Sequence, residues 1–403
     1  MGLGGGGDGW DHAAGDAAAA ATGMAPDNTF LRWIIGGEDG AGVMDTPVLE
    51  QMMSPPSNAA FGHNLSPSSF AAAAAMEDTK PAEALRFALS PTGDSPSPPA
   101  STPYDVVLKL GAYKTFSEIS PFLQFQHLTC VQAILDELAG ATSSSCIHVI
   151  DFDIGMGEQW ASLMQELASH RRAGAGVTPA PALKVTALVS PASHHPLELQ
   201  LIHENLSSFA AELGVFFQFA VYNIDTLDPS ELLSIAGAGG EAVAVHLPVG
   251  AAHAATLPAI LRLVKRLGAK VVVAVDRGVD RPDMPLAAHI LNSLHSSVFL
   301  LDSIDAVGID ADTATKIERF LIHPSIEQSV VARHRGGGAG VTWRGVFAAA
   351  GFVAATATTF AESQAESLVS KAHVRGFRVE KRGGALCLYW QRGELVSVSA
   401  WRC

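Results

Sequence analysis

The chain lacks the features that mark secreted, disulfide-rich or membrane-spanning proteins. Its 403 residues include only 4 cysteines, at positions 130, 146, 387 and 403, and none forms a CxxC pair. This spacing excludes a disulfide framework and a cysteine zinc site, so we interpret these residues as reduced intracellular thiols. The N-terminus has no basic and then apolar secretory pattern. The longest apolar stretches, 242–264 and 346–360, are alanine-rich and carry His, Pro or Thr, which argues against a membrane span.

Positive charge is also scarce. Lys and Arg together number 26, against 40 Asp and Glu, which gives a formal net charge of -14. A chain this acidic cannot coat nucleic acid with a broad electropositive face, although a local basic groove is compatible with the total. The composition therefore favours partners other than nucleic acid over most of the surface.

Residues 1–80 have too few apolar side chains for a core. Runs of glycine and alanine, at 4–7, 17–21 and 71–75, alternate with Ser- and Pro-rich stretches. Such a segment cannot bury enough apolar area to offset its ordering entropy, so we expect a disordered tail. One apolar run, FLRWII at 30–35, is either a docking motif that folds on a partner or a cluster with no role.

From residue 104 onward, short apolar runs alternate with helical periodicity. Strands are expected at 147–151, 183–189, 215–221, 242–247 and 271–275, with amphipathic helices between them. This alternation predicts a mostly parallel Rossmann- or methyltransferase-like sheet with helices on both faces. Three further runs, 377–381, 385–391 and 395–401, are separated by glycine turns and predict an antiparallel meander at one edge.

The first strand and the turn that follows it test an enzymatic interpretation. Asp151, Asp153, Gly155 and Gly157 lie where a dinucleotide or S-adenosylmethionine site would begin. Glu158 then follows where a third glycine would help close packing, and it would repel a phosphate. The second strand ends in Val-Ser-Pro, without the carboxylate that binds ribose. We therefore expect no cofactor.

Other catalytic patterns are missing. The sequence contains no GxSxG, P-loop or HExxH motif. The pair His194 and His195 has no metal partners at ligand spacing and is interpreted as a solvated loop. His148 lies within a strand and is interpreted as a hydrogen-bonded core histidine. Asp151 and Asp276 both end parallel strands, where capping of nearby backbone N–H groups explains them. No catalytic and no metal-binding residue is predicted.

Two motifs resemble those of the plant GRAS family of transcription regulators. The first, which corresponds to the family's VHIID motif, consists of Ile147, His148, Val149, Ile150 and Asp151. The second, at the C-terminus, corresponds to the SAW motif and consists of Ser399, Ala400 and Trp401. The stretches 112–124, 148–167 and 374–403 look like the Hairy Meristem (scarecrow-like) branch.

The resemblance also implies a division of the chain. Residues 81–403 would form the GRAS domain: 81–111 a remnant of the first leucine-rich region, 112–180 the VHIID region, 196–228 the second leucine-rich region, 237–328 the PFYRE region and 331–403 the SAW region. The letters PFYRE are not recognisable, so that region is assigned by position. Because the first region is short, the helical cap that family members place over the sheet should be incomplete.

What the resemblance implies is a non-enzymatic nuclear regulator with a role in plant development and meristems. Its expected partners are DNA-binding transcription factors and other GRAS proteins, with direct DNA binding also attributed to the family. A candidate basic binding patch consists of Arg375, Arg378, Lys381 and Arg382. No membrane partner and no small-molecule substrate are expected. The alternative is an S-adenosylmethionine-dependent methyltransferase.

Overall fold

The computed structural model describes residues 102–139, 146–173, 182–190, 193–227, 229–236, 240–250, 256–279, 281, 283–336 and 341–403. The tail expected at 1–80, the apolar run at 30–35 and most of the first leucine-rich region lie outside the described residues. The domain boundaries inside that part of the chain therefore stay predictions.

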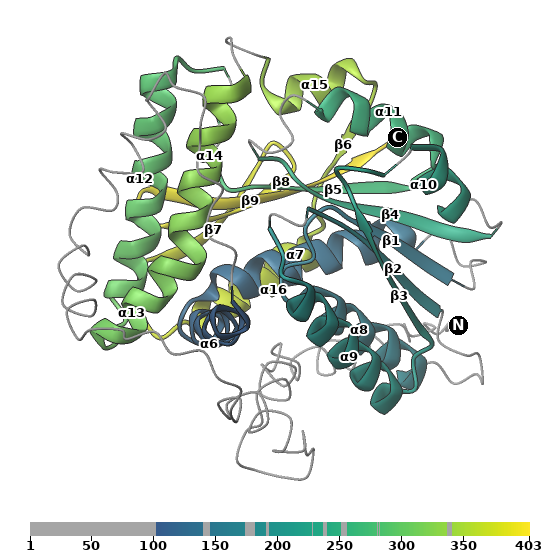
Figure 1. Ribbon diagram of the computed structural model, residues 1–403, viewed down its shortest axis with the longest axis horizontal. Helices are drawn as coiled ribbons and strands as arrows, with labels where there is room; N and C mark the ends of the chain where they lie inside the picture. Colours follow the sequence, from purple (N-terminus) through teal and green to yellow (C-terminus); the bar gives the residue numbers. More distant parts are fainter. Residues whose placement is uncertain are drawn as a thin grey trace, which may run out of the picture.

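The described residues are organised around one nine-stranded sheet with the order β3-β2-β1-β4-β5-β9-β8-β7, in which β6 also pairs with β9 (Figure 1). Five strands are parallel, as predicted: β1 (Cys146–Asp151), β2 (Ala182–Val189), β3 (Phe217–Asn223), β4 (Glu241–Pro248) and β5 (Val271–Asp276). Side chains alternate between the two faces. Val149 therefore lies in one hydrophobic core and Ile150 in the other.

The C-terminal meander completes one edge of the sheet, which confirms the expected antiparallel addition. Strand β9 (Gly393–Arg402) pairs antiparallel with β5, and β8 (Ala385–Trp390) and β7 (Phe377–Arg382) follow outward. The short strand β6 (Val353–Ala355) pairs with the end of β9. The mixed α/β fold class predicted from the sequence is thus confirmed.

Helices cover both faces of this sheet. One core contains residues of α6 (Pro103–Ile119), α7 (Pro121–Leu138), α8 (Glu158–Ala173), α9 (Pro196–Leu213) and α16 (Thr359–Ser370). The other contains residues of α10 (Pro229–Ala236), α11 (Leu257–Arg266) and α15 (Trp343–Ala349). Helix α7 begins as predicted, because Ser120 accepts the N–H of Phe122 and Pro121 occupies the first turn.

Parts of this architecture differ from the prediction. Strand β3 begins two residues later than expected, because Gly214 ends α9 in the left-handed conformation and the Val215 N–H bonds back to the carbonyl of Ala210. A helical layer between β5 and residue 336 was not predicted: α12 (Leu286–Asp305), α13 (Ala311–Ile317), a π-helical segment (Glu318–Ile322) and α14 (His323–Gly336). In Figure 1, α12 and α14 lie side by side at the end of the molecule formed by β7, β8 and β9.

Candidate functional site at the carboxyl edge of the sheet

Asp151, the last residue of β1, is the centre of a buried hydrogen-bond network. Its Oδ1 accepts the backbone N–H of Asp153 at 3.0 Å and lies 2.7 Å from His246 Nδ1, and its Oδ2 accepts Trp160 Nε1 at 2.7 Å. Burial alone would lower the pKa of His246, but the Asp151 carboxylate outweighs it and raises that pKa to about 10. The predicted capping role of Asp151 is confirmed, and a buried ion pair between β1 and β4 adds to it.

His148 is fully buried in the middle of β1. Its Nδ1 lies 2.9 Å from Glu241 Oε2 and its Nε2 lies 2.8 Å from Thr186 Oγ1. Burial lowers the pKa of His148, and the nearby Lys184 cation lowers it further, so the ring is neutral. A carboxylate only accepts, so Nδ1 donates to Glu241 and Nε2 accepts from Thr186. The interpretation of His148 as a hydrogen-bonded core histidine is confirmed.

The glycine turn after β1 serves the protein's own packing. Gly155 and Gly157 have φ of 53° and 79°, a conformation that favours glycine. A Cβ on Gly157 would lie 3.0 Å from Leu206 Cδ1 and 3.1 Å from Ile202 Cγ2, so the missing side chain lets α9 pack against the turn. A Cβ on Gly155 would lie 3.7 Å from the Tyr113 hydroxyl of α6. Both glycines therefore have a structural explanation that needs no ligand.

A buried polar cluster lies beside this turn, at the start of α8. The Ser117 hydroxyl donates to Glu158 Oε1 at 3.2 Å, and His127 Nδ1 lies 3.5 Å from Glu158 Oε2. Burial raises the pKa of Glu158 to about 7, and burial together with the charge on His246 lowers the pKa of His127 to about 3. At neutral pH the imidazole is therefore neutral and the carboxyl is close to its titration midpoint.

Cys130, on α7, lies beside His246, so that Cys130, His246 and Asp151 have the order of a nucleophile, base and orienting acid. Two features oppose catalysis by this set. The thiol is fully buried, and burial raises its pKa, whereas a nucleophilic cysteine needs access and a lowered pKa. The ion pair is therefore a scaffold feature.

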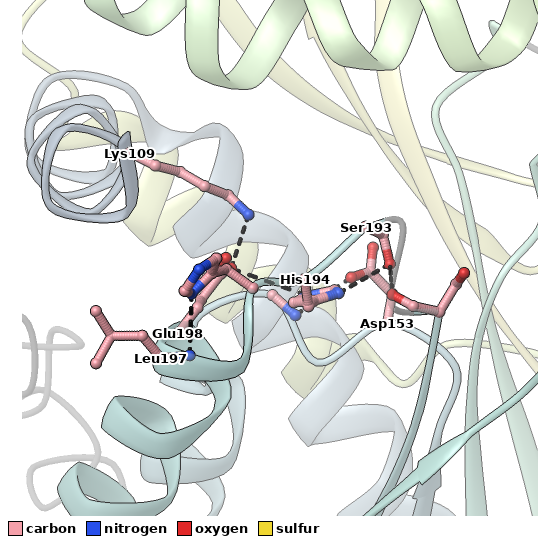
Figure 2. Close-up of polar contacts among 9 residues, drawn as sticks. Lys109, Asp153, Ser193, His194, Leu197 and Glu198 are labelled. Atoms are coloured by element: carbon pink, nitrogen blue, oxygen red, sulfur yellow. Dashed lines mark hydrogen bonds and ion pairs between the residues drawn. The ribbon is translucent and has the colours of Figure 1, made fainter. Parts of the chain in front are cut away.

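The histidine pair before α9 is half-buried and held by polar contacts, contrary to the predicted solvated loop. Figure 2 shows His194 between Ser193 and Glu198. Only 8% of the His194 side chain is exposed, and its Nε2 lies 4.0 Å from Glu198 Oε1, which also accepts from Lys109 of α6 at 2.7 Å. His195 Nδ1 accepts the N–H of Leu197 at 3.1 Å and caps α9. The pair thus fixes the start of α9 against α6, an environment that sequence spacing did not reveal.

Ser399, Ala400 and Trp401, the three residues that resemble the SAW motif, lie in β9. Ala400 pairs with Val273 of β5, and the Trp401 Nε1 donates to Ser399 Oγ at 3.0 Å. The buried Trp401 ring packs on Phe347 and Trp343 of α15, with centroid distances of 4.9 and 5.9 Å. The motif therefore fastens the meander to the parallel sheet.

Trp343, which the sequence analysis did not single out, connects this cluster to the end of β5. Its Nε1 donates to Asp276 Oδ2 at 2.8 Å, while Asp276 Oδ1 accepts the Gly278 N–H at 2.8 Å. The expected capping by Asp276 is thus confirmed and extended. Thr342, which caps α15 by accepting the Gly345 N–H, is a sequence signal that could have located this helix.

The candidate basic patch lies on β7 and the loop before it, where its four residues are exposed. Three of them have acidic partners. Arg378 Nε donates to Glu380 at 2.8 Å, Lys381 Nζ lies 3.7 Å from Glu362, and Arg382 pairs with Glu394. Arg375 makes no ion pair with any residue that the structure describes. The patch is therefore largely neutralised by its own carboxylates.

Within the described ranges, no cluster of three or more His, Cys, Asp and Glu side chains is arranged to hold a metal ion. None of the helices in these ranges is both long and apolar enough to cross a membrane.

Comparison with known proteins places these features in a family context. Residues 79–402 match the model of the GRAS domain family. Scarecrow-like protein 6 from Arabidopsis thaliana is 45% identical over 303 residues, or 75% of this chain and 52% of that protein. Scarecrow-like protein 27 from the same plant is 43% identical over 326 residues, or 80% and 50%. The chain spans about half the length of these curated relatives. The crystal structure of SCL7 in Oryza sativa superposes with a TM-score of 0.62 at 27% identity, covering 89% of this chain and 100% of that one.

Proposed function

This chain belongs to the GRAS domain family, and from that premise we propose that it is a non-enzymatic regulator of transcription that acts in the nucleus through contacts with other proteins. One observation carries the proposal. The family match spans the whole sheet, and the two segments that resemble family motifs lie in buried strands of that sheet. Residues 147–151 and Trp401 are at most 7% exposed, so their role is to stabilise the fold. Partners would then bind other residues, on the surface of this scaffold.

The partners proposed are DNA-binding transcription factors and other GRAS proteins. The test is a pull-down from nuclear extract with the folded chain as bait. We expect it to recover DNA-binding factors. A Trp401→Ala bait, which loses the packing between the meander and α15, serves as the matched control and should recover fewer of them. Recovery of no DNA-binding factor by the wild-type bait would contradict the proposal.

Direct DNA binding is a second proposed activity, through Arg375, Arg378, Lys381 and Arg382. Because three of these cations have carboxylate partners, we expect binding to be weak. Because the binding would come from contacts between cations and phosphates, its affinity should fall as the salt concentration rises. The double change Arg378→Ala and Arg382→Ala should flatten the dependence of affinity on salt. Lys316→Ala with Arg319→Ala, two exposed and paired cations on a distant helical segment, is the matched control. An unchanged slope in the first variant would exclude this patch.

The alternative is an S-adenosylmethionine-dependent methyltransferase, which the glycine turn after β1 and the terminal meander favour. Against it, the Tyr113 hydroxyl lies over Gly155 and the side chains of α9 pack on Gly157. Calorimetric titration with S-adenosylmethionine tests this alternative. We expect no heat of binding at millimolar ligand, and a saturable binding curve would favour the enzyme.

The finer assignment to the Hairy Meristem branch is also a proposal. The identity to the two Scarecrow-like proteins supports it. The division into regions at 81–111, 112–180, 196–228, 237–328 and 331–403, and the shortness of the first region, are proposed on the same resemblance.

A further inference from the structure

A crevice lies where β5 ends, between α7, α12 and α14. Its enclosed part has a cavity volume of about 20 Å³, which is room for one water-sized group, and the rest of the crevice is open to solvent. Its lining combines one guanidinium, from Arg277, with the side chains of Ser296, Ser297 and Ser325 and an apolar wall that includes Phe122 and Leu300. The crevice can therefore take in a single oxygen of a ligand that sits at its open mouth, and its lining is chemically mixed.

Arg277 brings several unused hydrogen-bond donors to this crevice. Its guanidinium lies over the Phe122 ring, 5.1 Å from the centroid, and its Nη1 donates to Ser325 Oγ at 3.3 Å. An arginine has five N–H donors, and the structure shows no other protein acceptor for them among the described residues. None of its nitrogens is fully enclosed without a partner, so the remaining N–H groups reach solvent-accessible space.

No carboxylate neutralises this cation at close range. Among the described residues none lies within ion-pair distance of Arg277, and Asp153 acts on it only from farther away. Burial lowers the pKa of Arg277 because it removes water from around the charge. A partly buried cation without an anionic partner is costly, and a bound anion would remove that cost.

The serines determine which ligands suit the crevice. The Ser296 hydroxyl donates to the Arg277 carbonyl at 3.3 Å, and the Ser297 hydroxyl donates to the Ser293 carbonyl at 2.9 Å, so both protons are engaged. Ser325 accepts from Arg277, which leaves its own proton available. The free groups are thus donors, and donors beside a guanidinium match the oxygens of a phosphate or carboxylate.

We propose that this crevice binds a small oxyanion through the Arg277 guanidinium and the Ser325 hydroxyl. The location agrees with the tendency of open α/β sheets to bind ligands beyond the carboxyl ends of their strands. The site lies at the end of β5 and involves neither the glycine turn nor the buried Asp151 network. It goes beyond the proposed function, because it adds a small-molecule ligand to a protein-binding scaffold.

The test is a calorimetric titration of the full chain at constant ionic strength set with chloride. Inorganic phosphate and acetate are the two probes, since each can place one oxygen in the crevice and together they distinguish a phosphate from a carboxylate. Saturable binding of either probe supports the site, and the tighter probe identifies the source of the oxyanion. Saturation by neither probe in the millimolar range overturns it.

Variants connect that binding to the crevice. Arg277→Gln should lower the affinity for the tighter-binding probe by at least about tenfold, because a charged, forked donor is lost. Arg281→Gln is the matched control, since this neighbouring arginine already donates to Asp283 at 2.9 and 2.8 Å and should bind the probe like the wild type. Equal affinity in Arg277→Gln and the wild type overturns the proposal. If thermal melts show that Arg277→Gln does not fold, Ser325→Ala decides, and an unchanged affinity in that variant overturns it.

Discussion

Asp151 and His246 lie opposite each other in the register of two neighbouring parallel strands and form an ion pair whose side chains are 1% and 3% exposed. Asp151, the last residue of the segment that resembles the VHIID motif, also accepts the Nε1 hydrogen of Trp160 in α8. A buried pair of this kind strongly penalises removal of one partner, because the other charge is left without compensation.

Asp151→Asn should therefore lower the free energy of unfolding by about 3–5 kcal/mol near pH 6. The pKa of His246 is raised to about 10 in the folded protein, above its usual 6.5. The stability that it contributes is fully present below pH 6.5 and is lost as the pH rises toward 10, a loss on the order of 3–5 kcal/mol. Denaturant melts across this range should show the decline in the wild type and not in Asp151→Asn. An identical pH profile in both would contradict the ion pair.

Glu158→Gln should act in a lower pH window. The pKa of Glu158 is raised to about 7 in the folded protein, from an ordinary value of 4.5. The protonated carboxyl suits its buried site, so stability is greatest below pH 4.5 and falls as the pH rises to 7. At pH 8 the free energy of unfolding of the variant should exceed that of the wild type by about 2–3 kcal/mol. Near pH 4 the two values should be the same. Glu366→Gln, at an exposed position of α16, is the control and should leave the profile unchanged. A variant less stable than the wild type at pH 8 would show that the carboxylate is favourable.

Trp401→Ala should cost about 3–5 kcal/mol in denaturant melts, because it empties a large buried site. The ring is 6% exposed and contacts Trp343 and Phe347. Arg402→Ala, next to it, removes an exposed cation paired with Glu137 and should leave the stability almost unchanged. A loss for Trp401→Ala as small as that of the control would place the ring outside the core.

Gly157→Ala should destabilise the fold by about 1–3 kcal/mol, since the added Cβ meets Leu206 and Ile202 at a positive φ. Gly111→Ala is a useful contrast. Gly111 lies within α6 with no atom close to the Cβ position. Alanine there should raise the free energy of unfolding by at most about 1 kcal/mol. Thermal melts of both variants check the pair. If Gly157→Ala melted like the wild type, packing against α9 would not explain this glycine, and a role in ligand binding would be open.

The parallel strands could be predicted because each is a short apolar run between turn signals. Residues 271–275, Val-Val-Val-Ala-Val, show this most clearly. Helix α12 could not be predicted in the same way. Its inward face includes His289, Ser293 and Ser297, which are buried, so no apolar period is visible. The Ser297 hydroxyl bonds a backbone carbonyl of its own helix, which makes its burial tolerable.

The site was predictable only where it depends on local sequence. Asp151 was expected at a strand end, and its contact with the Asp153 N–H is two residues away. His246 is 95 residues distant, and only the register of β1 against β4 brings it to Asp151. Arg277 was overlooked for a related reason. Its surroundings come from α7, α12 and α14, and two of those helices were not predicted.

Proximity labelling in plant cell nuclei tests the central claim most directly, because it measures compartment and partners together. A labelling enzyme fused to the chain should mark DNA-binding transcription factors and other GRAS proteins in the nuclear fraction. A fusion that carries Trp401→Ala should mark them much less. Labelling confined to cytoplasmic proteins, or equal labelling of these nuclear factors by both fusions, would contradict a folded scaffold that regulates transcription through its partners.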